Sequence, residues 1–447
     1  MSTVLIYTSP ARGHLYPMMD VALALQGQGH HVVVQTLAAE REHVEAAGVA
    51  HRAIAPAIEA ITMDDYTSSG TRAQILAALE TWMARAPHEV RDLQAAIDEL
   101  HPDLLVIDAN SWGASALAQA QGRPWAAFLP YALAVPSPDA PAFGPGFAPP
   151  RNGVDRTRDR LVTAATGRMV RPVISRLNAL RAGLGVPALG GLGDVQVQAD
   201  ALLYRTAEPF EYARRSWPAN VHPIGPGLWS PPGQAPAWLA DMPHPRVLVN
   251  VSTELQEDGA IIDAALEGLA DEPGSLIVTT SALDPDRFTA PHERTRIVRF
   301  LSHAAVIDDV DVVVTHGGMG STQRALAAGV PVVVVPWGRD QHESARRVEH
   351  SGAGVRLAPK RLTPQRLRAS VRDALGRTEA AGRVAAGFAA AGGAPRAVEI
   401  LESLIDVDPS PAGEPDTRAV ISSAQPTAMP TATPIPTATG AQRPTST

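Results

Sequence analysis

Residues 312–341 read VVVTHGGMGSTQRALAAGVPVVVVPWGRDQ, and this stretch decides the fold of the second half of the chain. Two apolar runs, residues 312–315 and 330–335, lie on either side of a glycine-rich turn and a short alanine-rich segment. Short valine-rich runs of this kind are typical of parallel strands that are buried on both faces. We therefore predict a strand, a turn, a helix over residues 321–328 and a second strand in an open α/β sheet.

The turn HGGMGS at residues 316–321 is a candidate anion site. A helix that starts directly after a strand points its free backbone N–H groups and the positive end of its dipole at one spot. Glycines let an anion approach the backbone, and His316 and Ser321 can donate hydrogen bonds. Asp340 and Gln341 follow the next strand at the same sheet edge, and their polar groups suit sugar hydroxyls. The simpler interpretation is a tight turn in which Ser321 caps the helix.

The composition excludes several classes of protein. The chain has 447 residues, of which 45% are hydrophobic and 19% charged, and this length suits two domains of roughly 100–200 residues. It has no cysteine, which excludes disulfides, thiolate metal sites and a cysteine nucleophile. The net charge of −8 and the pI of about 6.0 give no general attraction to nucleic acid. No run of ~18 apolar residues occurs, and the N-terminus has no basic region followed by a long apolar run. We therefore expect no membrane span, no signal peptide and a cytoplasmic location.

Strand-like and helix-like segments alternate in both halves of the chain, which predicts parallel sheets covered on both faces. The first strand covers residues 4–8, and a helical pattern covers residues 16–28. Residues 223–245 are dense in Pro and Gly and cannot form a long regular element. We therefore predict five parts: a first domain (1–222), a linker (223–245), a second domain (246–393), a helix that can pack back on the first domain (394–405), and a disordered Pro/Thr-rich tail (406–447).

The segment THGGMGS, followed by ALAAGVPVVVVP, DQ and ARRVE, resembles the donor-site motif of nucleotide-sugar-dependent glycosyltransferases. The resemblance is to family 1, whose GT-B fold has two Rossmann-like α/β domains with parallel sheets that face each other across a cleft. Within this family, the chain is most similar to bacterial enzymes that glycosylate antibiotics and other small natural products. The resemblance spans residues 1 to about 405 and leaves out the tail.

The resemblance implies donor-binding roles for the opening stretch. His316 would contact the α-phosphate of the nucleotide, and Asp340 and Gln341 would bind hydroxyls of the donated sugar. The β-phosphate would be bound by the small residues of the turn, Gly318, Gly320 and Ser321.

Two further segments match the donor site of the family. Ser252 and Thr253 follow the first strand of the second domain, where the family has a small hydroxylated loop near the phosphates. Residues 300–303 match the base-binding segment, which makes Phe300 and His303 candidate contacts to the base. Ser302 and His303 replace the Pro-Gln pair that is common in the family.

His14 is the candidate catalytic base. It follows the first strand, and we expect it on the first strand-to-helix loop. The family motif GHxxP matches Gly13, His14 and Pro17, and its histidine removes the proton from the acceptor hydroxyl. An imidazole suits this task because its ordinary pKa lies near neutral pH. Asp108 ends the strand LLVID and matches the family aspartate that orients the histidine, as in a serine-protease triad. The simpler interpretations are a helix-start histidine without a role and an aspartate that caps a helix.

The implied reaction is one in-line displacement at the anomeric carbon, with inversion, from a UDP- or dTDP-sugar. His316 and the helix N-terminus would stabilise the leaving diphosphate, so we expect neither a metal nor another cofactor. Asp284-Pro-Asp286 spells a DxD motif, but it lies in a Pro-containing loop away from the phosphate turn. We therefore interpret this motif as structural.

The expected partners are a nucleotide sugar and a small hydrophobic acceptor bound in the first domain. Candidate acceptor contacts are aromatic residues of two segments, namely Tyr66, Trp82, Tyr131 and Phe143. Each of these side chains could equally belong to the core. We expect no nucleic-acid partner, and a homodimer stays open.

Three other functions remain as alternatives. A nucleotide-sugar epimerase or hydrolase on the same fold would keep the phosphate site but need a different catalytic set. A dinucleotide-dependent oxidoreductase is disfavoured, because the turn lacks the third glycine of G-x-G-x-x-G. A non-catalytic binding or activator protein would have no use for His14.

Overall fold

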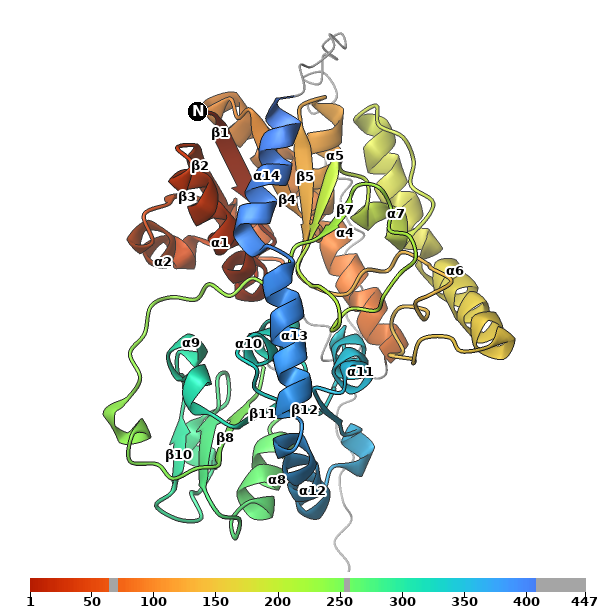
Figure 1. Cartoon of the computed structure of the whole chain (residues 1–447). Helices are drawn as coiled ribbons and strands as arrows, with labels where there is room; N and C mark the ends of the chain where they lie inside the picture. The colour runs from red at the N-terminus through yellow and green to blue at the C-terminus, as the bar shows by residue number, and fades with distance from the viewer. Residues whose placement is uncertain (64–70, 253–257, 407–447) are drawn as a thin grey trace, which may run out of the picture. The chain divides into compact units, whose positions relative to one another are not determined.

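The computed structural model describes residues 1–63, 71–252 and 258–406, all of which belong to one compact unit, Met1–Glu414. Tyr66, Thr253 and nearly all of the tail lie outside the described residues. Two separate parallel sheets form the framework, one in each half of the chain (Figure 1). The predicted pair of parallel α/β sheets is therefore confirmed.

The first sheet has seven parallel strands because the apolar runs of the first half are buried on both faces. Val4 and Ile6 of its third strand point into one core, whereas Leu5 and Tyr7 point into the core on the other face. The strands in spatial order are β3 (Ala50–Ala53), β2 (His31–Thr36), β1 (Thr3–Tyr7), β4 (Leu104–Asp108), β5 (Trp125–Leu129), β6 (Ala201–Tyr204) and β7 (Val221–Pro223).

Helices cover both faces of this sheet. The core on one face contains residues of α1, and the core on the other contains residues of α4 and α5. The helices of the first half are α1 (Arg12–Gly27), α2 (Arg41–Ala46), α3 (Pro56–Glu59), α4 (Thr71–Leu100), α5 (Trp112–Ala120), α6 (Gly153–Gly183) and α7 (Leu192–Gln196).

The second sheet has six parallel strands, which are β10 (Thr295–Val298), β9 (Ser275–Thr279), β8 (Arg246–Asn250), β11 (Val312–Thr315), β12 (Val332–Val334) and β13 (Gly354–Arg356). Two further hydrophobic cores lie on its two faces. The helices of this half are α8 (Ala260–Gly268), α9 (His303–Val306), α10 (Met319–Ala327), α11 (Gln341–Ser351), α12 (Pro364–Leu375) and α13 (Thr378–Ala390).

The last described helix, α14 (Gly393–Ile405), packs against α1 and the first sheet (Figure 1). Its buried residues Ala397 and Leu401 join the core that contains Leu25 of α1. His30 Nε2 lies 3.1 Å from Glu402 Oε1, so this histidine has a structural partner. The end of the described chain is thus anchored on the first half.

Three predicted boundaries were wrong by a few residues. The helix α1 begins at Arg12, because Leu15 N–H already donates to Ala11 C=O at 3.1 Å. His14 therefore lies in the first turn of a helix and not on a loop. Helix α10 likewise begins before Ser321, at Met319, and the first strand covers Thr3–Tyr7 in place of residues 4–8.

Both sheets have a point where the strand order reverses. In the first sheet it lies between β1 and β4, and in the second it lies between β8 and β11. Loops at the carboxyl ends of two such strands diverge to opposite faces and leave a crevice that binds ligands in open α/β sheets. The candidate catalytic and donor-binding residues follow these strands.

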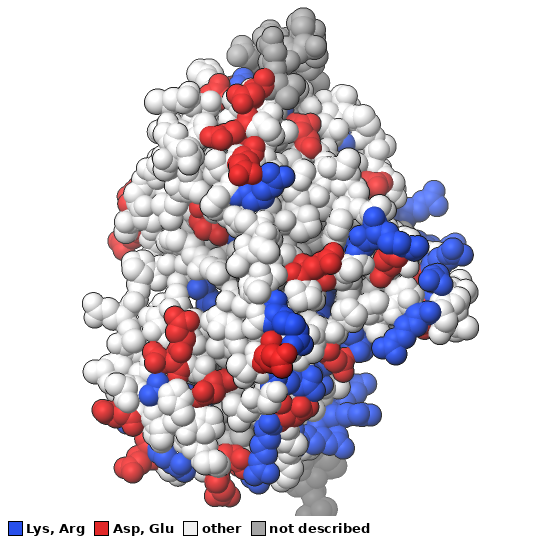
Figure 2. All heavy atoms as spheres, viewed as in Figure 1, with Lys and Arg blue, Asp and Glu red and all other residues white. Residues whose placement is uncertain are grey.

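The charged surface is mixed over most of the face shown in Figure 2, and basic side chains gather beside α6. Two arginines of this helix are paired: Arg158 lies 2.9 Å from Asp159, and Arg176 lies 2.5 Å from Glu80. No described helix is both long and apolar enough to cross a membrane.

Candidate active site

His14 and Asp108 meet at the reversal point of the first sheet. His14 Nδ1 lies 2.7 Å from Asp108 Oδ2, and the carboxylate is completely buried. Asp108 also accepts hydrogen bonds from the backbone N–H groups of Ser9, at 3.2 Å, and Asn110, at 2.9 Å. The His14 side chain keeps 19% of its surface exposed. The arrangement therefore holds the ring through Nδ1 and leaves the imidazole accessible from one side.

Asn110 and Tyr131 extend this pair. Asn110 Nδ2 lies 3.3 Å from His14 Nε2, and Asn110 Oδ1 accepts a 2.6 Å hydrogen bond from the Tyr131 hydroxyl. The rings of Tyr131 and His14 are 6.1 Å apart. With Nδ1–H donated to Asp108, Nε2 carries the lone pair that Asn110 approaches, which is the tautomer a base needs. Our sequence reasoning missed Asn110, although it follows Asp108 by only two residues.

A buried carboxyl group supports the helix behind this site. Glu89 of α4 accepts a 2.8 Å hydrogen bond through Oε2 from the backbone N–H of Gly113, at the start of α5. Burial raises its pKa to about 8, and Asp108 adds to the effect. Its Oε1 has no partner among the described residues. Glu89 therefore helps to fix the helix that follows the Asp108 loop.

The turn after β11 forms the second part of the site. Gly317 has a φ of 99°, a conformation that glycine adopts readily, and a Cβ there would lie 2.6 Å from Val334. A Cβ on Gly318 would lie 2.6 Å from His316 Nε2, so the ring lies directly over this glycine. Gly318 is the N-cap of α10 and places the free N–H groups of that helix beside His316.

His316 is neutral at physiological pH. Burial, with a contribution from Arg339, lowers the pKa of this imidazole to about 4. Its Nδ1 has no hydrogen-bond partner among the described residues, and neither does the buried hydroxyl of Thr322 in the first turns of α10. Gly320 and Ser321 lie in the first turn of the same helix. Unpaired donors at a helix N-terminus form an arrangement that suits an anion.

The loop before α11 completes this edge. The Gln341 side-chain oxygen accepts hydrogen bonds from the backbone N–H groups of Trp337, at 2.7 Å, and Gly338, at 3.1 Å. Gln341 thus shapes the loop that carries Arg339 and Asp340. Arg339 has a φ of 51°, an uncommon conformation for a residue other than glycine, and such strain is often found at functional sites. We did not single out Arg339 from the sequence.

The two parts of the site lie within electrostatic reach of one another. Burial raises the pKa of the Asp340 carboxyl group. This pKa is lowered again by a hydrogen bond from its own backbone and by the charges of Arg339 and His14. Burial also raises the pKa of Tyr131, and Asp108 and Asp340 increase it further. Such influences require side chains that are close in space. The fold therefore brings Asp340, from the second half, to the His14 side of the site.

The remaining donor candidates occupy loops of the second half. Ser252 is buried, and its N–H donates to Asp258 at 2.7 Å. Phe300 is 73% exposed, in the loop after β10. His303 begins α9, and burial beside Arg324 lowers its pKa to about 4.

The acceptor candidates separate into two groups. Tyr131 lies at His14, whereas Trp82 packs edge-on against Trp112, with ring centroids 5.5 Å apart, in a cluster of α4, α5 and α6. Phe143 packs against a core of the second half. Tyr131 is therefore the one described candidate that the fold brings to His14.

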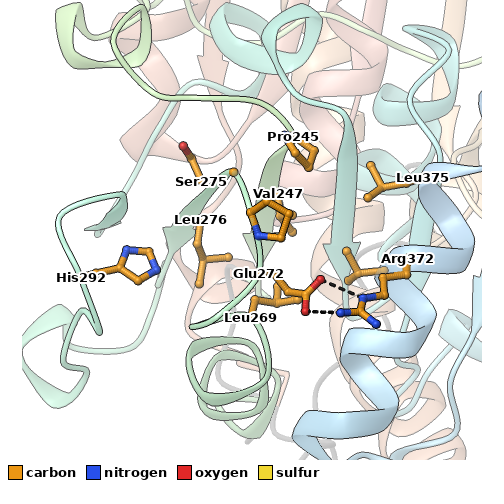
Figure 3. A pocket seen from close by; sticks show the side chains of 12 residues that line it. Pro245, Val247, Leu269, Glu272, Ser275, Leu276, His292, Arg372 and Leu375 are labelled. Carbon is orange, nitrogen blue, oxygen red and sulfur yellow. Dashed lines mark hydrogen bonds and ion pairs between the residues drawn. The ribbon is translucent and has the colours of Figure 1, made fainter.

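A shallow hollow of about 320 Å³ lies elsewhere in the second half, at the amino ends of β8 and β9 (Figure 3). Pro245, Val247 and Leu276 line it, and Glu272 and Arg372 form a two-point ion pair at its side. It lies at the opposite sheet edge from His316 and plays no part in the site described above.

The described residues contain no group of three or more His, Asp or Glu side chains that could hold a metal ion. Asp284 of the DxD sequence accepts a hydrogen bond from the backbone N–H of Asp286, at 3.4 Å, and caps a short turn.

Comparison with known proteins relates the chain to enzymes that transfer sugars. Residues 264–407 match the family described as erythromycin biosynthesis protein CIII-like, C-terminal domain. The chain is 30% identical to the 4'-demethylrebeccamycin synthase of Lentzea aerocolonigenes over 419 residues. The aligned region covers 90% of this chain and 99% of that protein. It is 26% identical to the demethyllactenocin mycarosyltransferase of Streptomyces fradiae, over 82% of this chain and 78% of that enzyme.

Solved structures share the fold. The glycosyltransferase VinC, solved in complex with dTDP, superimposes with a TM-score of 0.67 at 22% identity, covering 91% of this chain and 100% of that one. The glycosyltransferase of kitacinnamycin gives a TM-score of 0.70 at 22% identity, covering 90% of this chain and 98% of that chain.

Proposed function

We propose a specific reaction for this chain, which belongs to the family of GT-B glycosyltransferases that act in antibiotic and other natural-product pathways. In this reaction the enzyme moves a sugar from a UDP- or dTDP-sugar to a hydroxyl group of a small hydrophobic acceptor, with inversion at the anomeric carbon. The observation that carries the proposal is the 2.7 Å contact between His14 and buried Asp108, within electrostatic reach of Asp340.

His14 acts as the general base in this proposal. Its Nδ1–H donates to Asp108, so the lone pair of Nε2 can accept the proton of the acceptor hydroxyl. The acceptor oxygen then attacks the anomeric carbon while the bond to the diphosphate breaks, and the proton remains on Nε2. Asp108 stabilises the imidazolium that forms, and its two backbone hydrogen bonds hold the carboxylate in place. Asn110 Nδ2 lies 3.3 Å from Nε2 and gives up this contact when the acceptor hydroxyl binds.

The donor is held by the second half. The diphosphate lies against His316 and the α10 N-terminus, with Gly318, Gly320 and Ser321 as further contacts, and Arg339 balances its charge. Before the donor binds, burial lowers the pKa of His316 to about 4 and keeps the ring neutral. Asp340 and Gln341 bind the sugar hydroxyls. We assign Ser252, Phe300 and His303 to the nucleoside and phosphates, and Thr253 stays a prediction. A dTDP donor is supported by the dTDP complex of VinC.

The acceptor lies against Tyr131, next to His14. Tyr66, Trp82 and Phe143 stay predictions as further acceptor contacts, and so do a cytoplasmic location and a homodimer. The acceptor class, a small natural product with a hydroxyl group, follows the rebeccamycin and lactenocin relatives.

A thermal-shift panel with UDP, dTDP, GDP, ADP and NAD tests the donor half of the proposal. A ligand at 100 times its Kd stabilises a protein by roughly 2.7 kcal/mol, which gives a measurable shift. We expect a shift with UDP or dTDP that is lost in His316→Ala. No shift with any nucleoside diphosphate, or a shift with NAD alone, would overturn the donor assignment. The anomeric configuration of the product, read by NMR, then tests inversion.

A further inference from the structure

The segment between β5 and α6 that covers residues 131–147, here named the bridging segment, contacts both parts of the site. At its beginning, the Tyr131 hydroxyl donates to Asn110, which touches His14. Near its end, the backbone N–H groups of Gly144 and Gly146 both donate to Glu343 Oε1, at 2.9 and 3.0 Å. Glu343 lies in the first turn of α11, three residues after Asp340. One continuous segment therefore runs from the surroundings of His14 to α11, the helix that starts at Asp340 and Gln341.

Glu343 is itself fixed by a buried ion-pair network. Its Oε2 lies 2.9 Å from Arg347, one turn further along α11. Arg347 makes two more hydrogen bonds, both at 2.9 Å, to the two carboxylate oxygens of Glu211 in the first half. All three side chains are at most 2% exposed. Charges buried this completely hold their geometry, because losing one partner leaves an unpaired charge in the interior.

Gly146 is held from a second side. Its carbonyl oxygen accepts hydrogen bonds from Arg346 of α11, at 3.0 Å, and from Arg356 of β13, at 2.9 Å. The contact is close, because a Cβ on Gly146 would lie 2.3 Å from the backbone oxygen of His342. The bridging segment thus lies directly on the backbone of α11, and no larger residue fits between them.

We propose that Glu343 is a positioning residue that fixes the bridging segment on α11 and thereby aligns the acceptor at His14 with the sugar at Asp340. This inference rests on the proposed function. No hydrogen bond among the described residues joins the bridging segment to His316, and its Ala132 and Phe143 meet Met319 of α10 only through a shared apolar core. We therefore expect nucleotide binding to depend little on Glu343. The alignment of the acceptor oxygen with the anomeric carbon does depend on it. When it is lost, water replaces the acceptor, and the sugar nucleotide is hydrolysed.

Gly146→Ala tests this without removing a charge. The added methyl group forces the bridging segment away from α11. Gly122→Ala serves as the matched control. Both glycines have a φ of 63°, but a Cβ on Gly122 meets nothing within 4 Å. The two variants therefore carry similar backbone strain, and only one disturbs the contact. Glu343→Gln provides a second test, because it keeps an oxygen for the two N–H groups but loses the charge that faces Arg347.

Three quantities are measured for each variant: dTDP affinity, transfer rate, and hydrolysis of the sugar nucleotide without acceptor. A displacement of about 1 Å at reacting atoms can cost on the order of 10²-fold in rate, so we expect at least about a ten-fold loss of transfer in Gly146→Ala. We expect its dTDP affinity to change less than about two-fold, because Gly146 contacts α11 and β13 and not the α10 N-terminus. We expect its ratio of hydrolysis to transfer to rise. Glu343→Gln should shift the same ratio in the same direction.

Equal transfer-to-hydrolysis ratios in Gly146→Ala, Gly122→Ala and the wild type would overturn the inference. So would a parallel loss of dTDP affinity and transfer, because this result indicates a general structural defect. Failure of the proposed function gives a different result, since the wild type itself would then bind no nucleoside diphosphate and transfer no sugar.

Discussion

The buried imidazole of His316 makes the stability of the second half depend on pH. In the folded chain its pKa is about 4, compared with an ordinary value of 6.5, because burial disfavours the charged ring. Between these two values the unfolded chain holds a proton that the folded chain does not. Stability from this residue is therefore fully present above pH 6.5 and is lost as the pH falls toward 4.

The size of the effect follows from the two pKa values. One pKa unit corresponds to about 1.4 kcal/mol, so lowering the pH from 7.5 to 5 costs the folded state about 2 kcal/mol at this residue. At about 2.1 cal/mol/K per residue, a change of 1 kcal/mol shifts Tm by roughly 1 °C in the unit Met1–Glu414, so the expected difference is about 2 °C. His316→Asn and His316→Gln remove the titrating ring and should lack this part of the pH dependence.

The assay is thermal unfolding of the wild type and both variants at pH 7.5 and pH 5, at constant ionic strength. The quantity compared is the change in Tm between the two pH values within each protein, which cancels the direct cost of the substitution. We expect a smaller change in both variants than in the wild type. An equal change in all three proteins would refute the argument and place a charged or exposed imidazole at position 316.

Three further predictions follow from individual contacts. Gly318→Ala places a Cβ 2.6 Å from His316 Nε2 and should weaken dTDP binding about ten-fold or more. Gly167→Ala of α6, where a Cβ meets nothing within 4 Å, is the control and should bind normally; calorimetry decides, and equal affinities would contradict the geometry. Asn110→Ala removes the acceptor of the Tyr131 hydroxyl beside His14 and should lower kcat/KM about ten-fold, the value of one hydrogen bond. Unchanged kinetics would remove Asn110 from the site. In the wild type, the raised pKa of Glu89, about 8, makes folding less favourable as the pH rises from 4.5 through 8. Glu89→Gln lacks this loss, so its stability relative to the wild type should be higher at pH 9 than at pH 6. An identical pH profile of the two proteins would contradict a buried, protonated Glu89.

The sequence was sufficient to predict the two sheets and the sheet edges at which His14, Asp108 and His316 lie. Valine-rich runs identify buried parallel strands, and the residues that follow them must lie at the carboxyl edge of the sheet. The exact helix starts were not predictable, because Pro10 and Gly13 suggest a loop while Ala11 in fact serves as the N-cap of α1.

Other parts of the site depend on contacts between distant residues. Asn110 and Arg339 are polar residues in loops, and only their distance to His14 and His316 distinguishes them from other loop residues. Trp82 has the same spacing whether it faces a core or a pocket, and its partner Trp112 lies on another helix. The contact of Glu343 with Gly146 joins residues 197 positions apart, which the pattern of a single sequence does not encode.

The central claim is that His14 takes the proton of the acceptor hydroxyl. It is tested most directly by measuring kcat/KM of the wild type and His14→Gln with two acceptors, an ordinary alcohol and a phenol acidic enough to be ionised at the assay pH. General-base catalysis is typically worth about 10²–10⁴-fold, so the variant should lose that factor with the alcohol and far less with the ionised phenol, which needs no base. An equal loss with both acceptors, or no loss with the alcohol, would contradict the account.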